Sequence, residues 1–209
     1  MFSMCPGVED NQNYKKVISS PHRIAIFASG SGTNAEAIMA HFVNHPTVEV
    51  AALLSNNPSA YALERARKYN VPTLVFNRSQ FRESEEVLNW LIGKKISHIV
   101  LAGFMWLVPD YLVKKYSGRI INIHPALLPK YGGKGMYGMH VHEAVKAAGE
   151  KETGITIHLV NERYDEGRIL LQAKVSLTGK ETAEEIAAKV HALEYRHYPD
   201  VIEKWVRNS

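Results

Sequence analysis

Short apolar runs alternate with segments of helical spacing along almost the whole chain, beginning at Arg23. The runs are nearly continuous in Val, Ile, Leu and Ala, which is typical of parallel strands buried on both faces. The segments between them carry apolar residues three and four positions apart, as helices that cover such a sheet do. The alternation therefore predicts an α/β fold with a mostly parallel, doubly wound sheet.

The pattern also predicts the extent of each element. Strands are expected at 23–29, 48–55, 71–76, 96–104, 119–125, 153–160 and 168–177. Helices are expected at 34–45, 63–69, 81–92, 110–116, 142–149 and 181–205. The last two strands alternate apolar and polar residues more regularly than the others, so we expect an antiparallel pair at the C-terminal edge of the sheet. Thr182 and Glu185 have the spacing of a capping box at the start of the long last helix.

Length and cysteine content restrict the architecture further. The 209 residues fit a single α/β domain, which we place at residues 21–209 after a loose N-terminal extension at residues 1–20. Cys5 is the only cysteine, so an intrachain disulfide and a cysteine-rich zinc site are excluded. The polar start lacks the basic and apolar segments of a signal peptide, and no apolar run approaches the roughly 20 residues of a bilayer span. We therefore expect a cytoplasmic protein without a membrane partner.

The charge pattern favours small anionic ligands over nucleic acid. The formal net charge is +4, which mildly favours anionic partners. The basic residues are scattered, however, and form no stripe of the kind that nucleic-acid-binding proteins present. We expect no nucleic-acid partner.

A glycine-containing turn, SGSGTN at 29–34, separates the first expected strand from the first expected helix. Such a turn presents free backbone N–H groups and the positive end of the helix dipole, which together bind phosphate. It lacks the third glycine and the acidic residue of a dinucleotide fingerprint, and it lacks the Gly-Lys-Ser/Thr of a Walker loop. A single phosphate is therefore the expected ligand. The alternative is a turn of small residues in which Ser31 or Thr33 merely caps the helix.

Two polar side chains, Asn122 and His124, lie at the end of the strand expected at 119–125. They are two residues apart, so they share a face of the strand, and Pro125 ends the strand because it has no N–H to donate. Open α/β sheets bind ligands at this carboxyl edge. An amide donor beside an imidazole suits an oxyanion that forms on a carbonyl carbon. The alternative is an edge histidine that solvent satisfies.

Further polar groups follow later in the chain. Asp165 lies in an acidic loop before the last strand, where a carboxylate orients a histidine or accepts its proton if the two meet. His140 and His142 have an H-x-H spacing, but no carboxylate or cysteine pattern accompanies them, so we expect no metal site. Residues 127–139 carry four glycines without periodicity, which predicts a mobile surface loop.

Four motifs together resemble the glycinamide ribonucleotide formyltransferases, a branch of the folate-dependent formyltransferases. They are SGSGTN (29–34), AGFMWLVP (102–109), NIHPALLPKY (122–131) and DEGRILLQ (165–172). The NIHP-x-LLP pattern is specific to the wider folate-dependent group, and SGSGTN in a short chain points to the glycinamide ribonucleotide branch. The resemblance extends from about Arg23 to Trp205. It implies a Rossmann-like formyltransferase fold and a step of de novo purine biosynthesis.

The resemblance assigns a role to individual residues. The family's catalytic residues match Asn122, His124 and Asp165, and a supporting histidine matches His158. The site of the substrate phosphate matches Gly32, Thr33 and Asn34. The site of the ribose and glycinamide matches His191, Ala192, Leu193 and Glu194. The folate site matches Arg82, Met105, Trp106, Leu107, Val108, Asn122, Asn161, Glu162, Arg163, Tyr164 and Asp165.

The resemblance also implies the substrates and the mechanism. The formyl donor is 10-formyltetrahydrofolate, a co-substrate that is consumed, and no permanently bound cofactor is implied. The acceptor is phosphoribosylglycinamide, whose amine attacks the formyl carbon directly. Asn122 and protonated His124 hold the oxyanion, and Asp165 orients the imidazole and helps to move the proton, without a covalent enzyme intermediate. Beyond these small molecules, a monomer or homodimer is expected.

Two features depart from the family pattern. Trp106 stands where many relatives carry a basic or smaller residue, so the contacts beside the pterin are expected to differ. The segment 130–145 is a few residues longer than in relatives with a short loop. We expect this loop to fold over the site as a lid. Hydrogen exchange that is equally fast with and without ligand would contradict the lid.

Four other functions fit the same core. A methionyl-tRNA formyltransferase is expected to carry a further C-terminal domain. A formyltetrahydrofolate hydrolase is expected to carry an N-terminal regulatory domain, for which twenty residues leave no room. A sugar-nucleotide formyltransferase shares the core, although SGSGTN favours a simple phosphate. A non-catalytic folate-binding module leaves the joint presence of Asn122, His124 and Asp165 unexplained.

Overall fold

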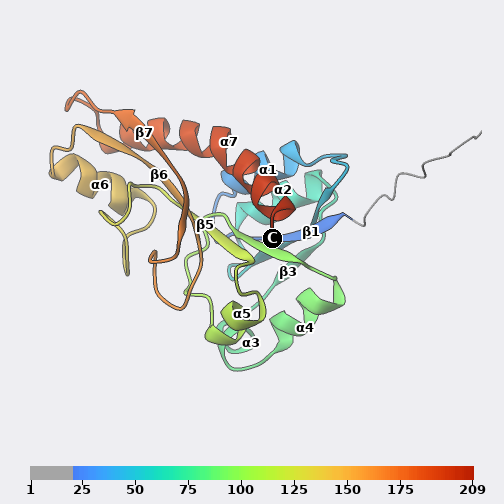
Figure 1. The fold of residues 1–209 in the computed structure, drawn as a ribbon. Helices are drawn as coiled ribbons and strands as arrows, with labels where there is room; N and C mark the ends of the chain where they lie inside the picture. The colour runs from blue at the N-terminus through green and yellow to red at the C-terminus, as the bar shows by residue number, and fades with distance from the viewer. Residues whose placement is uncertain (1–20) are drawn as a thin grey trace, which may run out of the picture.

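A seven-stranded mixed sheet runs through the centre of the computed structural model, which describes residues 21–209 (Figure 1). The extension expected at residues 1–20 lies outside the described residues. The strands are β1 (His22–Phe27), β2 (Val48–Ser55), β3 (Thr73–Val75), β4 (His98–Leu101), β5 (Ile120–His124), β6 (Glu152–Leu159) and β7 (Ile169–Ser176).

The strand order is β3-β2-β1-β4-β5-β6-β7. The first five of these strands run parallel, whereas β6 is antiparallel to both β5 and β7. The predicted mostly parallel sheet with an antiparallel C-terminal edge is therefore confirmed. The order reverses between β1 and β4, and open α/β sheets bind ligands beyond the carboxyl ends of strands at such a switch point.

Helices cover both faces of the sheet, as expected for a doubly wound fold. They are α1 (Thr33–His41), α2 (Tyr61–Lys68), α3 (Arg78–Arg82), α4 (Glu86–Gly93), α5 (Asp110–Lys115), α6 (Met139–Ala147) and α7 (Ala183–Arg207). Helices α1, α2, α6 and α7 bury apolar residues in a core on one face, and α3, α4 and α5 pack into a second core on the other. No helix within residues 21–209 combines the length and the apolar character that a membrane crossing requires.

One expected helix is wrong: residues 81–92 belong to two helices, α3 and α4. The Asn77 side chain accepts the Gln80 N–H, so α3 begins earlier than its apolar spacing suggests. The Ser84 hydroxyl then donates to the Gln80 carbonyl and accepts the Glu86 N–H. A serine that bonds the backbone on both sides competes with the helical ladder, which explains the break between the two helices.

The long C-terminal helix, α7, is tied to the strand ends that lie beneath it. Its predicted capping box is confirmed, because the Thr182 hydroxyl accepts the Glu185 N–H and the Glu185 carboxylate accepts the Thr182 N–H. Farther along, the fully buried Tyr198 donates its hydroxyl to the Leu101 carbonyl at 2.8 Å. This bond fixes the helix over the carboxyl end of β4.

Candidate active site

Strand register brings Asn122 level with the ends of two neighbouring strands. Phe27, the last residue of β1, pairs with Leu101, the last residue of β4, and Leu101 pairs with Asn122. His124 therefore lies two residues beyond that row, on the same face of β5 as Asn122. The two polar side chains project at the carboxyl edge of the parallel strands, as their spacing predicted.

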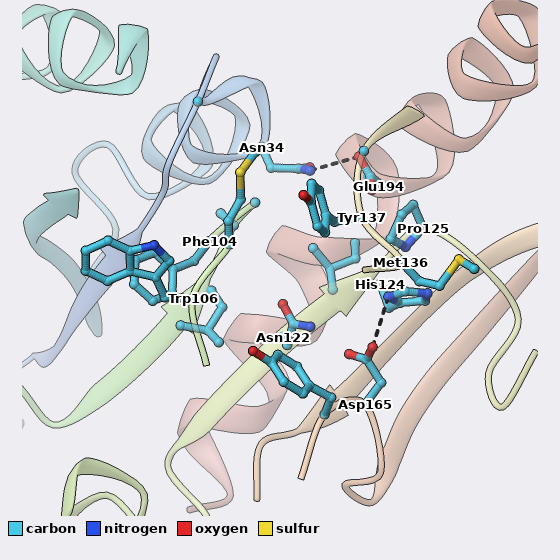
Figure 2. Close-up of a pocket in the computed structure, with 18 of the residues that line it drawn as sticks. Asn34, Phe104, Trp106, Asn122, His124, Pro125, Met136, Tyr137, Asp165 and Glu194 are labelled. Atoms are coloured by element: carbon cyan, nitrogen blue, oxygen red, sulfur yellow. Dashed lines mark hydrogen bonds and ion pairs between the residues drawn. The ribbon is translucent and has the colours of Figure 1, made fainter. Parts of the chain in front are cut away.

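Four polar side chains converge at this point, and Figure 2 labels Asn122, His124 and Asp165 among them. The His124 Nδ1 atom lies 3.6 Å from an Asp165 carboxylate oxygen, and the His158 Nε2 atom lies 3.5 Å from the other. The Asn122 amide nitrogen lies 3.3 Å from His158 Nε2. Asn122, His124, Asp165 and His158, which come from two strands and a loop, thus form one cluster.

The loop between β6 and β7 folds back to bring Asp165 to this cluster. Its first residue, Val160, donates its N–H to the Ile120 carbonyl, near the opposite end of β5. Asp165 itself has a φ of 55°, in the left-handed region, and accepts the Gly133 N–H at 2.9 Å. A left-handed backbone is uncommon outside glycine, although Asp tolerates it better than most residues, so the surrounding contacts must hold it.

The His158 ring fixes the orientation of the Asn122 amide. Its Nδ1 atom lies 2.9 Å from the Leu159 carbonyl, which only accepts hydrogen bonds, so Nδ1 carries the proton. In the neutral ring Nε2 is then an acceptor and takes an N–H from Asn122. The second N–H of the same amide has no hydrogen-bond partner among residues 21–209.

The electrostatics place a carboxylate beside a neutral imidazole in the free protein. Burial lowers the pKa of His124, which is 3% exposed, and the nearby Asp165 charge and the Tyr131 carbonyl offset this only in part. His124 Nε2 donates to that carbonyl at 2.7 Å. Burial opposes ionisation of Asp165, yet the neighbouring His158 and His124 side chains and the Gly133 N–H together hold its pKa below the usual value.

A cavity of about 480 Å³ joins this cluster to the turn after β1. Most of the residues expected at the site line it: Gly32, Thr33, Asn34, Met105, Trp106, Leu107, Val108, Asn122, His124, His158, Arg163, Tyr164, Asp165, His191 and Glu194. Five do not, namely Arg82, Asn161, Glu162, Ala192 and Leu193. The helical period explains the last two, because residues three apart on α7 share a face and the two between them do not.

The turn after β1 leaves the start of α1 without a side-chain cap. Gly32 is the N-cap residue, at φ 71°, and no side chain bonds the first amides of the helix. Neither Ser31 nor Thr33 therefore caps the helix, which removes the alternative interpretation of the turn. A β-carbon at Gly32 would lie 2.5 Å from that of Ala62, so both the backbone angle and the approach of α2 require glycine.

A buried carboxylate lies beside this turn, at the same end of the cavity. Glu194 is 4% exposed and accepts hydrogen bonds from the Asn34 amide at 2.8 Å and from His191 Nδ1 at 2.9 Å. The hydrogen bond with Glu194 raises the pKa of His191. This group links the start of α1 to α7 (Figure 2).

Sequence reasoning missed three contributors to the site. The Ser29 hydroxyl accepts the Met105 N–H at 3.0 Å and donates to the Asn56 side chain at 2.6 Å, which fixes the strip 105–108 against the first turn. The Tyr131 carbonyl bonds His124, but a backbone atom has no signature in a sequence. His142 lines the cavity, although its spacing with His140 suggested only a metal ligand. Within residues 21–209, no three His, Cys, Asp or Glu side chains are placed to hold a metal ion.

Fold and site together define an α/β enzyme with a cavity at the switch point of a parallel sheet, where an amide, an imidazole and a carboxylate converge. The family model described as formyl transferase matches residues 22–202. The chain belongs to the formyl transferase family.

Proteins named as formyltransferases resemble the chain over most of its length. It is 38% identical to the phosphoribosylglycinamide formyltransferase of Haemophilus influenzae over 88% of this chain and 86% of that protein. It is equally identical to the chloroplastic phosphoribosylglycinamide formyltransferase of Arabidopsis thaliana over 86% of this chain, but it spans only 64% of that protein's length.

Solved structures agree with these sequence relatives. Glycinamide ribonucleotide transformylase 1 from Geobacillus kaustophilus superposes with a TM-score of 0.81 at 36% identity, covering 89% of this chain and 99% of the other. Phosphoribosylglycinamide formyltransferase from Bacillus halodurans gives a TM-score of 0.78 at 40% identity, covering 87% and 94%.

Proposed function

We propose that this protein transfers the formyl group of 10-formyltetrahydrofolate to the amine of phosphoribosylglycinamide, a step of purine biosynthesis. One observation carries the proposal: a single cavity has an uncapped helix N-terminus at one side and the cluster of Asn122, His124 and Asp165 at another. A phosphate-anchored amine and a formyl carbon therefore both have a place within it. The names of the relatives at 36–40% identity support the same substrates.

Each substrate has a matching part of the cavity. The free amides at the start of α1 hold the acceptor's phosphate, because the helix dipole favours an anion there. The strip 105–108 and the opposite wall at 163–165 enclose the pterin. Arg82 lies outside the cavity with its guanidinium 3.5 Å from the Leu107 carbonyl, where it meets the folate's anionic tail.

The reaction is a direct acyl transfer. The amine nitrogen bonds to the formyl carbon, whose C=O electrons move to oxygen and create a tetrahedral oxyanion. The free N–H of Asn122 donates to that oxygen, which stabilises charge only as it develops. The bond between the carbon and N10 of the folate then breaks, and N10 gains the proton that the amine loses.

His124 and Asp165 carry this proton from the amine to N10. Burial keeps His124 neutral at neutral pH in the free protein. The ring takes up the proton that the amine loses, because the negative charge that forms nearby stabilises the protonated imidazole. Its two ring nitrogens face the Tyr131 carbonyl and Asp165, and both partners favour the protonated ring. The resemblance implied a protonated His124. We assign that state to the reacting complex and the neutral ring to the free protein. The carboxylate of Asp165 orients the ring and, through water, passes the proton to N10.

A spectroscopic assay tests this function. The protein is mixed with 10-formyltetrahydrofolate and phosphoribosylglycinamide, and folate absorbance is followed with and without the acceptor. Absorbance should change only when the amine is present, with formylated acceptor as the product. Loss of the formyl group without the amine would indicate a hydrolase, and transfer to a sugar nucleotide or to methionyl-tRNA instead would indicate those branches of the family.

Four expectations about the protein's context stay predictions. Residues 21–209 are proposed as one domain, and the protein as a monomer or homodimer without a permanently bound cofactor. A cytoplasmic location is proposed as well, although two plant relatives are named chloroplastic.

A further inference from the structure

His142 is a buried polar side chain in the cavity wall to which the reaction gives no role. It lies near the start of α6 and is 2% exposed. Its Nδ1 atom is buried and has no hydrogen-bond partner among residues 21–209. Buried polar groups in folded proteins are almost always hydrogen-bonded, so an unpartnered imidazole at the wall of a cavity needs a physical explanation.

The neighbours of His142 show what kind of ligand this wall suits. The His142 ring packs edge-on against the His191 ring, with centroids 6.3 Å apart, and His191 bonds Glu194. Glu194 also accepts from the Asn34 side-chain nitrogen, while the oxygen of the same Asn34 side chain is a second buried atom without a partner in the described part of the chain. Two unsatisfied polar groups thus lie beside a buried carboxylate, at the part of the cavity where Figure 2 shows Asn34 and Glu194 meeting.

The missing ligand at this wall must donate hydrogen bonds. The Glu194 carboxylate and the Asn34 carbonyl only accept, and burial together with the His191 charge lowers the pKa of His142, so its ring is neutral with one donor and one acceptor. A phosphate is a poor match, because it brings acceptors and a charge that Glu194 repels. Sugar hydroxyls match, because each both donates and accepts.

We propose that His142 hydrogen-bonds a ribose hydroxyl of the acceptor and is a specificity-determining residue for its ribosyl group. The inference rests on the proposed function, since that function puts a ribose between the phosphate at α1 and the amine at Asn122. It adds α6 to α1 and α7 as the elements that enclose the sugar, and it gives the unpartnered imidazole its bond.

The test compares two acceptors: phosphoribosylglycinamide and its analogue without the two ring hydroxyls. Calorimetry gives the Kd of each, and steady-state assays give KM and kcat. His142→Ala should weaken binding of the ribosyl acceptor about tenfold or more, with kcat within a few-fold, and should leave binding of the dideoxy analogue nearly unchanged. Wild-type protein should itself prefer the ribosyl acceptor.

Three further variants make the result specific. His142→Gln and His142→Asn place an amide near Nε2 and Nδ1 respectively, so rescue by one of them identifies the bonding nitrogen and guards against a folding defect in the alanine variant. His140→Gln is the matched control, because His140 is exposed on the same helix and does not line the cavity. It should bind both acceptors as the wild type does.

Equal weakening for both acceptors, or no weakening for either, would overturn the role of His142. A loss as large in His140→Gln would do the same. Wild-type protein that binds the ribosyl acceptor in a His142-dependent way but transfers no formyl group would instead remove the proposed function and keep the binding role.

Discussion

At the scale of single residues, the proposed mechanism uses atoms whose hydrogen bonds are already formed in the free protein. Asn122 has one N–H bonded to His158, whose own proton is fixed by the Leu159 carbonyl. A donor that is oriented before the substrate arrives needs no reorganisation when charge develops, which is why such groups accelerate acyl transfer.

Replacing Asn122 should therefore affect the chemical step. For Asn122→Ala we expect kcat to fall about 10²–10³-fold, because the oxyanion loses its amide donor. KM for both substrates should change little, since the donor acts mainly in the transition state. Single-turnover assays measure the step directly, and a variant within threefold of wild type would contradict the role.

The charge of Asp165 should be visible in the titration of His124. Burial lowers the pKa of that ring and Asp165 opposes the lowering, so Asp165→Asn should move the pKa lower still. Nitrogen-15 NMR of the imidazole measures it. Glu166→Gln, an exposed neighbour in the same loop, serves as the control and should leave the titration unchanged. If the pKa of His124 stays constant or rises in Asp165→Asn, the charge of Asp165 does not act on His124.

At the scale of elements, the turn between β1 and α1 depends on one glycine. Gly32→Ala should destabilise the protein by about 2 kcal/mol or more, because its left-handed backbone and the contact with Ala62 both oppose a β-carbon. Urea unfolding measures the loss. Gly30→Ala is the matched control, since a β-carbon there meets nothing within 4 Å, and it should cost far less. Similar losses for the two variants would contradict the argument.

Periodicity predicted the elements better than their ends. The expected strands and most helices are present because buried strands and amphipathic helices leave a repeating signal over many residues. The expected helix at 81–92 failed because a single hydroxyl, that of Ser84, interrupts the ladder without disturbing the apolar spacing. The strand expected at 96–104 ends at Leu101, just before Gly103 turns the chain with a φ of 74°.

The site was predictable only where its residues are neighbours in sequence. Asn122 and His124 share a face because strands repeat every two residues, so their proximity follows from local geometry. Asp165 joins them through a loop that folds back across β5, and such tertiary placement leaves no periodic trace. The residue types made Asp165 a candidate, but only the resemblance to a family assigned it to the same site as His124. The unpartnered imidazole of His142 emerged only from its surroundings.

At the scale of the whole molecule, a histidine buried beside α7 should make the fold sensitive to acid. Burial, and to a lesser extent His22 and Arg119, lower the pKa of His98 to about 4, and its ring packs edge-on against Trp205. Below pH 6.5, the ordinary pKa of histidine, His98 is protonated in the unfolded chain but stays neutral in the folded protein. The contribution of His98 to the free energy of unfolding is thus fully present above about pH 6.5. It is lost as the pH falls towards 4, a loss of about 3 kcal/mol.

Unfolding at two pH values tests this acid sensitivity. The free energy of unfolding of wild-type protein and of His98→Gln is measured in urea at about pH 7 and about pH 4.5. The loss between the two values should be smaller in the variant by about 2–3 kcal/mol, whatever its stability at neutral pH. The same substitution at exposed His140 should leave the loss unchanged. Equal losses in wild type and His98→Gln would assign the acid sensitivity to other groups.

The hydroxyl of Ser29 has a consequence for how this architecture can be altered. It is hydrogen-bonded to the loop that follows β2 and to the loop that follows β4. One small side chain therefore connects the loops after β1, β2 and β4. Only a compact residue that both donates and accepts satisfies these bonds in a buried position. Transplanting the first turn into a relative without a side-chain acceptor at 56 would therefore leave the Ser29 hydroxyl proton unmatched, so the loops after β1 and β2 should be exchanged together.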